Sequence, residues 1–246
     1  MSTIAIIGGT GLSQIADLEI SGKKRLTTPY GDPSAAYVTG RIAGTAVIFL
    51  ARHGNPHNIP PHRINYRANI WGLKELGATT VIAAAAVGGI TQEMSPGRIV
   101  IPAQLIDYSY GREHTYFADD LQQVIHIDFT NPYHEPLRQR LLQAADKTGI
   151  PVCPRGVYGC TQGPRLETAA EIQRMQHDGC DLVGMTGMPE AALAQELELD
   201  YAACAVVANW AAGKSESAIT MAEIEHNLEQ GMTDMLKLLH QYLLDC

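Results

Sequence analysis

The sequence has no long apolar run, no block of like charges and no paired cysteines, and each absence excludes a class of protein. Its apolar stretches are too short to span a bilayer, and we expect neither a leader at Met1 nor a membrane segment. The net charge of −8 argues against nucleic-acid binding. The five cysteines lack CxxC spacing, so neither a disulfide framework nor a metal site is expected. We expect a cytoplasmic protein with reduced, buried thiols.

Apolar runs and amphipathic segments alternate along the 246 residues. We expect strands at residues 2–7, 46–50, 80–87, 98–101, 104–106, 156–160, 182–185 and 202–207, and helices at 65–76, 136–147, 167–175, 189–196 and 220–244. Residues 108–131 are polar and irregular, which predicts a long functional loop. The alternation favours an α/β fold, with a mixed and mainly parallel sheet flanked by helices. No linker or repeat divides the chain, so we expect one domain over residues 1–246.

A glycine turn at residues 8–11 follows the first expected strand. It lacks the third glycine of a dinucleotide-binding motif, and no clear acidic residue lies ~20 positions on. A turn whose backbone N–H groups and Thr10 hydroxyl contact one phosphate fits better. A plain tight turn is the simpler alternative.

Polar side chains also follow two other expected strands. Arg52 and His53 come after residues 46–50, and arginine presents a planar fork that matches phosphate oxygens. Met185 and Thr186 end another run, where the hydroxyl could donate to the same anion and the thioether could offer a soft apolar surface. The alternatives are a surface salt bridge for Arg52 and a core methionine beside a capping threonine.

Glu167 and Asn209 carry the most specific chemistry. An ionised carboxylate only accepts hydrogen bonds, whereas an amide both donates and accepts. Together they match a 6-oxopurine: Glu167 would accept from N1–H, and Asn209 would donate to O6 and accept from N7–H. Taken singly, Glu167 could be a helix N-terminal carboxylate and Asn209 a turn residue.

Five ordered segments together resemble the trimeric purine nucleoside phosphorylase and methylthioadenosine phosphorylase family. They are residues 6–12, 51–54, 65–71, 163–165, and 184–186 with 189–190. The resemblance implies phosphorolysis of a nucleoside, with inorganic phosphate as co-substrate and no metal or organic cofactor. It also implies a homotrimer with the site at the subunit interface, where His126 closes a neighbour's sugar pocket.

The resemblance assigns roles to individual residues. Phosphate would be held by Thr10, Arg52, His53, Thr186 and the backbone of Ala85 and Ala86. Met185 would lie under the sugar and Asn209 would meet N7, with Arg52, His53 and Asn209 as the catalytic set. Substrate binding would be completed by Leu166, Glu167, Trp210 and Ala211.

Several positions depart from the 6-aminopurine members of this family. Asn209 and Ala211 stand where those members have two aspartates, and Glu167 stands where they have a serine. An ionised Glu167 would face the N1 lone pair of adenine, so rejection of 6-aminopurines by a factor on the order of 10²–10⁴ is expected. Leu166 replaces an aromatic residue and Ala85 a phosphate-contacting threonine, which weakens one contact at each position.

At the sugar end, Met221 and Ile224 are apolar where purine nucleoside phosphorylases place a histidine for the 5′-hydroxyl. The 6-oxopurine match of Glu167 and Asn209, combined with apolar residues at the 5′ end, predicts S-methyl-5′-thioinosine as substrate. The alternatives are an inosine/guanosine phosphorylase, a methylthioadenosine phosphorylase, and a nucleotide-binding module without turnover.

Overall fold

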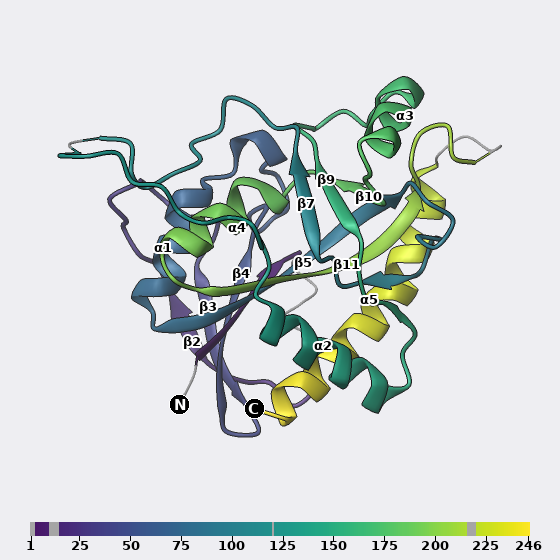
Figure 1. Ribbon diagram of the computed structural model, residues 1–246. Helices are drawn as coiled ribbons and strands as arrows, with labels where there is room; N and C mark the ends of the chain where they lie inside the picture. Colours follow the sequence, from purple (N-terminus) through teal and green to yellow (C-terminus); the bar gives the residue numbers. More distant parts are fainter. Residues whose placement is uncertain (1–2, 10–14, 120, 216–219) are drawn as a thin grey trace.

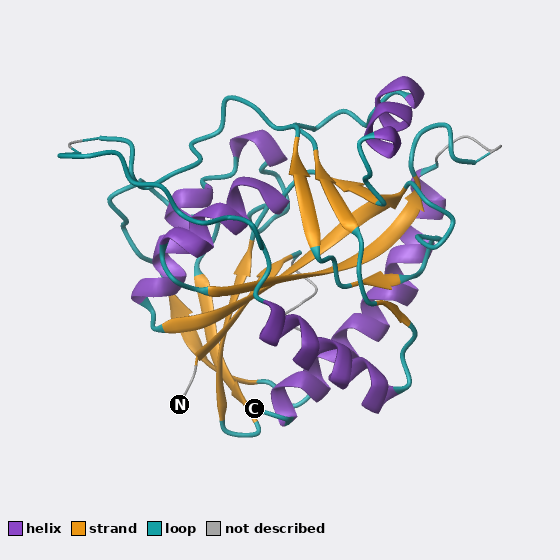
Figure 2. Cartoon of the chain, viewed as in Figure 1, coloured by secondary structure: helices purple, strands orange, loops and turns teal. Residues whose placement is uncertain are grey.

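A central twisted sheet with helices on both faces forms the protein (Figure 1). A computed structural model of the chain describes residues 3–9, 15–119, 121–215 and 220–246, with the backbone alone at Met221 and Glu223. The helices α2 and α5 lie side by side on one face, and α1 and α4 contact one another on the other (Figures 1 and 2). Each pair covers its own apolar core. The expected α/β class is confirmed.

The described residues contain eleven strands and five α-helices. The strands are β1 (Thr3–Gly8), β2 (Glu19–Lys24), β3 (Tyr37–Ile42), β4 (Thr45–Ala51), β5 (Ala78–Gly89), β6 (Ile99–Val100), β7 (Gln104–Asp107), β8 (Val152–Cys153), β9 (Val157–Cys160), β10 (Leu182–Gly184) and β11 (Asp200–Trp210). The helices are α1 (Tyr66–Glu75), α2 (Glu135–Thr148), α3 (Ala169–His177), α4 (Gly187–Glu196) and α5 (Met221–Leu244), with a 3₁₀ turn η2 at Pro61–Arg63.

Every expected helix is confirmed, and local signals explain where the helices begin and end. The Asn65 side chain accepts a hydrogen bond from the Ala68 N–H and starts α1. A capping box of Thr168 and Glu171 starts α3. Gly149, at φ 67°, ends α2 in the left-handed region. The expected strands are present too, but β2, β3 and β8 were not predicted.

The sheet is mixed and mainly parallel, in the order β2-β3-β4-β1-β5-β10-β9-β7. The strand β5 pairs with β11 along its length. On its other edge, pairing with β1 ends at Ala83 and pairing with β10 begins at Gly88. No strand among the described residues pairs with the edge of β5 between these two residues, and a split of this kind is where α/β sheets bind ligands.

The cysteines form no disulfide. Four of them are buried as expected, but Cys246 is exposed, so the expectation of buried thiols was wrong for that residue. No helix in the described ranges is long and apolar enough to cross a membrane.

Candidate active site

A cavity of about 670 Å³ opens at the unpaired edge of β5. Its walls come from the ends of β4, β10 and β11, from the loop before α3 and from one side of α5. The structure brings most of the predicted site residues together here: Arg52, His53, Ala85, Ala86, Leu166, Glu167, Met185, Thr186, Asn209, Ala211 and Ile224.

Four predicted site residues are not placed in this lining. Thr10 lies outside the described residues, and the side chain of Met221 is not described. Trp210 is absent from the lining, although its neighbours Asn209 and Ala211 are part of it. His126 is exposed on the loop between β7 and α2 and is also absent from the cavity of its own chain.

A buried ion pair holds Arg52 at the end of β4. Its Nε and Nη2 donate to Glu190 at 2.7 and 2.8 Å, while Nη1 and Nη2 donate to the carbonyls of Ala84 and Ile7. Burial lowers the pKa of Arg52 and Glu190 raises it, and the net direction is upward. Four of the five guanidinium N–H groups are thus used within the protein. The expectation that the planar fork is free to bind phosphate oxygens was therefore wrong. One Nη1–H remains.

The open edge of β5 presents one backbone donor. The carbonyl of Ala84 points to this edge, because it accepts from Arg52 at 2.8 Å. Successive strand residues turn their N–H and C=O groups to opposite edges, so Ala86 shares the edge of Ala84. Ala85 turns instead toward β11, where Ala205 is its register partner. Of the two alanines, Ala86 therefore offers its N–H to the cavity.

His53 is neutral at physiological pH. Burial, Arg52 and His57 lower its pKa to about 4, against a hydrogen bond to Ile59 that raises it. Its Nδ1 lies 2.9 Å from the carbonyl of Ile59, which can only accept, so the proton is on Nδ1. The ring stacks on His57 at 4.4 Å. The lone pair of Nε2 is consequently an acceptor, suited to a protonated oxyanion.

Glu167 does not cap a helix. The helix α3 starts from Thr168, and its first-turn carboxylate is Glu171. Glu167 instead accepts a hydrogen bond from the Thr161 hydroxyl at 2.6 Å, and it is half-buried in the cavity wall. Gly163, at φ 60°, lets this loop approach Met185, because a Cβ there would lie 2.5 Å from the Met185 Sδ.

Asn209 lies inside β11 and is not a turn residue. The pairing of β11 with β5 shifts register between Val207 and Asn209, and this irregularity re-aims the strand end. The Asn209 Nδ2 donates to the carbonyl of Trp210 at 2.7 Å. The second Nδ2–H and Oδ1 make no other hydrogen bond among the described residues, so the amide keeps one donor and one acceptor.

Thr186 precedes α4, but its side chain makes no capping hydrogen bond. It is buried and lines the cavity beside Met185. The alternative of a capping threonine is therefore wrong, and both the backbone N–H and the side chain of Thr186 interact with the Tyr158 hydroxyl.

Two charged residues that support the site were not predicted. The sequence analysis included Glu190 only in the motif at residues 189–190. Its place as the one acid in the otherwise apolar segment 189–194 could have indicated a buried ion-pair partner. Arg112 is buried and donates to the carbonyls of Thr161, Gln162 and Met185. It thereby ties the long loop after β7 to the cavity, and no sequence pattern marked it.

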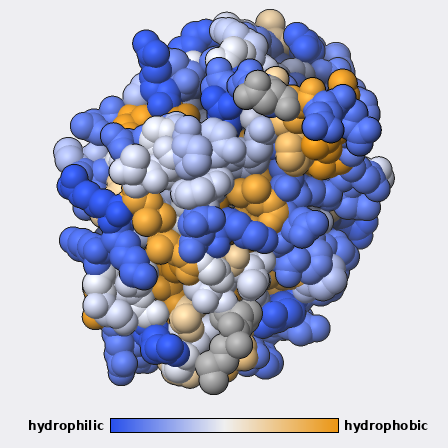
Figure 3. All heavy atoms as spheres, turned by 90° about the vertical axis from the view of Figure 1, so that its left-hand side faces the viewer, coloured by the Kyte–Doolittle hydropathy of each residue, from blue (hydrophilic) through white to orange (hydrophobic). Residues whose placement is uncertain are grey.

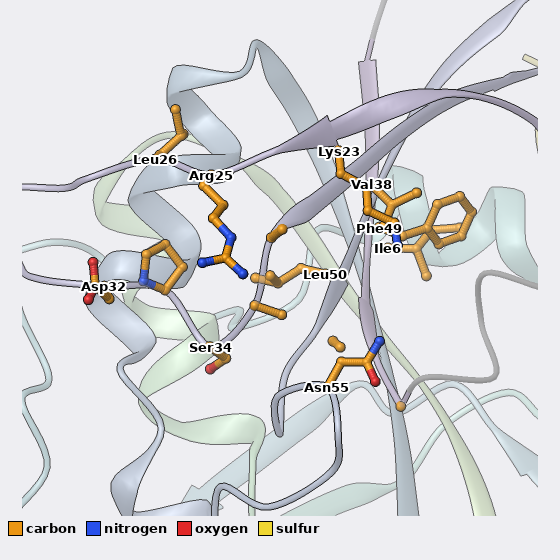
Figure 4. A pocket seen from close by; sticks show the side chains of 15 residues that line it. Ile6, Lys23, Arg25, Leu26, Asp32, Ser34, Val38, Phe49, Leu50 and Asn55 are labelled. Carbon is orange, nitrogen blue, oxygen red and sulfur yellow. The ribbon is translucent and has the colours of Figure 1, made fainter.

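A second hollow, of about 850 Å³, lies against β3 and β4 (Figure 4). Its lining includes the charged residues Lys23, Arg25 and Asp32 and the apolar residues Phe49 and Leu50. No predicted site residue in the described ranges lines it, and it shares only Gly9 with the first cavity. In the described part of the chain, no three His, Cys, Asp or Glu side chains are grouped to hold a metal ion.

Comparison with known proteins agrees with this geometry. Residues 3–244 match the phosphorylase superfamily. A protein of Pseudomonas syringae pv. tomato named probable S-methyl-5′-thioinosine phosphorylase is 59% identical over 94% of both chains. The 6-oxopurine nucleoside phosphorylase of Pyrococcus furiosus is 45% identical over 97% of this chain and 91% of its own. The structure of Schistosoma mansoni methylthioadenosine phosphorylase with adenine superposes with a TM-score of 0.94, at 32% identity, over 99% of this chain and 91% of that one.

Proposed function

The chain belongs to the phosphorylase superfamily, and we propose that it cleaves S-methyl-5′-thioinosine with inorganic phosphate. The products are hypoxanthine and S-methyl-5-thioribose 1-phosphate. One observation carries the proposal: an acceptor-only carboxylate, Glu167, and a donor–acceptor amide, Asn209, line the same cavity as the anion-binding groups.

The base end of the cavity suits a 6-keto purine. The free oxygen of Glu167 accepts from N1–H, the remaining Nδ2–H of Asn209 donates to O6, and its Oδ1 accepts from N7–H as the base departs. Adenine reverses the demand at N1 and would leave the carboxylate facing a lone pair, which costs about 1–3 kcal/mol or more. Names of two relatives point the same way: one is a thioinosine enzyme and one a 6-oxopurine enzyme.

The phosphate end combines donors with one acceptor. One Nη1–H of Arg52, the Thr186 hydroxyl and the Ala86 N–H donate to phosphate oxygens. The neutral Nε2 of His53 accepts the hydrogen that a phosphate monoanion or dianion carries. Because Glu190 offsets the charge of Arg52, Arg52 contributes a directed N–H donor to this end rather than a net positive charge. Thr10 belongs to the proposal for this end on its sequence motif alone, because it lies outside the described residues.

Catalysis then rests on positioning and on charge. Phosphate attacks C1′ as the bond to N9 breaks, the sugar becomes cationic in the transition state, and the purine leaves as an anion. The purine takes up a proton from solvent at N7, and this proton is balanced by the one that the attacking phosphate loses as it becomes a monoester. Asn209 stabilises that developing negative charge at O6 and N7. Met185 lies under the sugar, and no covalent enzyme intermediate, metal or organic cofactor takes part.

The α5 side of the cavity is mostly apolar. Ile224, Leu228 and Met232 form one stripe of α5 that lines the cavity, and Glu229 and Thr233 line it beside this stripe. A 5′-methylthio group would bury apolar surface against this stripe, whereas a 5′-hydroxyl would find no partner on it. Met221 belongs to the same proposal.

The assembly we propose is a cytoplasmic homotrimer with the site at the subunit interface. The loop between β7 and α2 projects from the body of the molecule (Figure 1), and it carries exposed Leu121, Val124 and Ile125 next to His126. The face on that side is mostly hydrophilic but has separate apolar patches (Figure 3). Exposed apolar side chains on a projecting loop support contact with a second copy of the chain. In that contact His126 would close the sugar pocket of the second copy.

Steady-state rates on methylthioinosine, methylthioadenosine, inosine and guanosine test this function. We expect phosphate-dependent hypoxanthine release, with the highest kcat/KM for methylthioinosine. A highest kcat/KM for methylthioadenosine or inosine would select one of the alternative phosphorylases. Binding without phosphate-dependent turnover would reduce the protein to a nucleoside-binding module.

A further inference from the structure

Glu167, the carboxylate proposed to bind the base, lies between the main cavity and a smaller pocket. Glu167 lines the 670 Å³ cavity and also a neighbouring pocket of about 440 Å³, whose lining includes Thr161. It is half-buried, and a glutamate side chain has three rotatable bonds. Without a partner its carboxylate could turn toward either space, so its use as a base reader requires a group that fixes it.

Thr161 is that group. Its hydroxyl lies 2.6 Å from one carboxylate oxygen of Glu167, Oε1. Thr161 is itself held, because its N–H donates to the Gly184 carbonyl at 2.8 Å and its own carbonyl accepts from Arg112 at 3.1 Å. The hydroxyl is therefore anchored between the ends of β9 and β10, and Oε2 is left for the base.

Arg165, two residues before Glu167 in the sequence, forms its ion pair with another carboxylate. Arg165 makes a two-point ion pair with Glu171, at 2.7 and 2.9 Å, and the Thr168 capping box holds Glu171. Within the described ranges Glu167 forms no ion pair, and Thr161 is its hydrogen-bond partner. A hydrogen bond from Thr161, rather than a direct ion pair, therefore holds the carboxylate.

We propose that Thr161 is a positioning residue that sets the base preference of this site by holding the Glu167 carboxylate in one orientation. The inference rests on the proposed function. A carboxylate oxygen held in place accepts from N1–H of a 6-oxopurine, whereas adenine N1 carries a lone pair and has no hydrogen to donate to it.

The test is the ratio of kcat/KM for methylthioinosine to that for methylthioadenosine. T161V keeps the shape of the side chain and removes the donor. We expect kcat/KM for methylthioinosine to fall roughly tenfold, as loss of a charge-assisted hydrogen bond implies, while that for methylthioadenosine falls less than about twofold. T161S retains the hydroxyl and should restore most of the ratio. If Thr161 had only a structural role, kcat/KM would fall by the same factor for both substrates.

T148V is the matched control, because the Thr148 hydroxyl bonds only to carbonyls of α2 and lies outside the cavity lining. It should leave both rates unchanged. Thermal melting verifies that each variant is folded, and T161A gives the same comparison if T161V does not fold. A wild type that prefers methylthioadenosine overturns the proposed function. A wild type that prefers methylthioinosine, with an unchanged ratio in T161V, overturns only the role of Thr161.

Discussion

Arg52 and Glu190, 138 residues apart in the chain, form a two-point ion pair in which both side chains are buried. Arg52 follows β4 and Glu190 lies in α4, so the pair ties one wall of the cavity to the helix that follows Met185 and Thr186. Tyr201 adds a hydrogen bond to the same carboxylate at 2.9 Å. The pair fixes the guanidinium whose one remaining Nη1–H we propose as a phosphate donor.

Substituting Glu190 by glutamine should destabilise the protein, because Arg52 would remain buried without a compensating charge. We expect the free energy of unfolding to fall by about 3–5 kcal/mol and the KM for phosphate to rise. Urea denaturation and phosphate titration measure the two effects. E198Q, at an exposed acid just after α4, is the control. A loss in E190Q no larger than in this control would contradict the account.

Exchanging the base readers should change the preferred purine. The triple variant E167S/N209D/A211D installs the side chains of 6-aminopurine enzymes in the cavity. The ratio of kcat/KM for methylthioadenosine to that for methylthioinosine should rise, by a factor on the order of 10². Competition between the two nucleosides in one reaction measures the ratio. An unchanged preference in a folded, active triple variant would remove Glu167 and Asn209 as the base readers.

The buried neutral state of His53 predicts how stability depends on pH. Its pKa is lowered from 6.5 to about 4 by burial, with Arg52 and His57 adding to the shift. Between these values the unfolded chain binds more protons, so this histidine makes stability fall as pH drops from about 6.5 to 4. H53N should lose less stability over that range than the wild type, in urea titrations at several pH values. H177Q, at an exposed histidine, should behave as the wild type does.

The apolar stripe of α5 predicts the 5′ preference. Substituting Ile224 by threonine places a hydroxyl in the lining and reduces buried apolar surface. The preference for methylthioinosine over inosine should fall by roughly fivefold, or about 1 kcal/mol. I20T makes the same change at an exposed position of β2 and should leave the ratio alone. If I224T and the wild type prefer methylthioinosine over inosine by the same factor, the 5′ group does not bind against Ile224.

The place of the site was predictable because apolar runs that end in polar residues mark the carboxyl ends of strands. The segments at Arg52, Thr186 and Asn209 do meet at one cavity. The hairpin of β2 and β3 escaped prediction because β2, an edge strand, is almost entirely exposed and has no apolar alternation. The two-residue strand β8 is too short for any periodicity.

What the sequence could not supply is the pairing of distant polar groups. The sequence predicted from side-chain chemistry alone that the Arg52 guanidinium binds phosphate. Only the folded structure shows that its Nε and Nη2 groups already donate to Glu190. Glu167 was predicted as a base reader, but its support by Thr161 depends on the loop geometry between β9 and α3. Local patterns identify chemical types, whereas long-range contacts decide which of their donors remain free.

A crystal structure with hypoxanthine and phosphate bound tests the selection of the base most directly. The account predicts N1 of hypoxanthine at about 2.7–3.0 Å from a carboxylate oxygen of Glu167, with O6 and N7 facing the amide of Asn209. A base bound with that edge turned away from both side chains would contradict it.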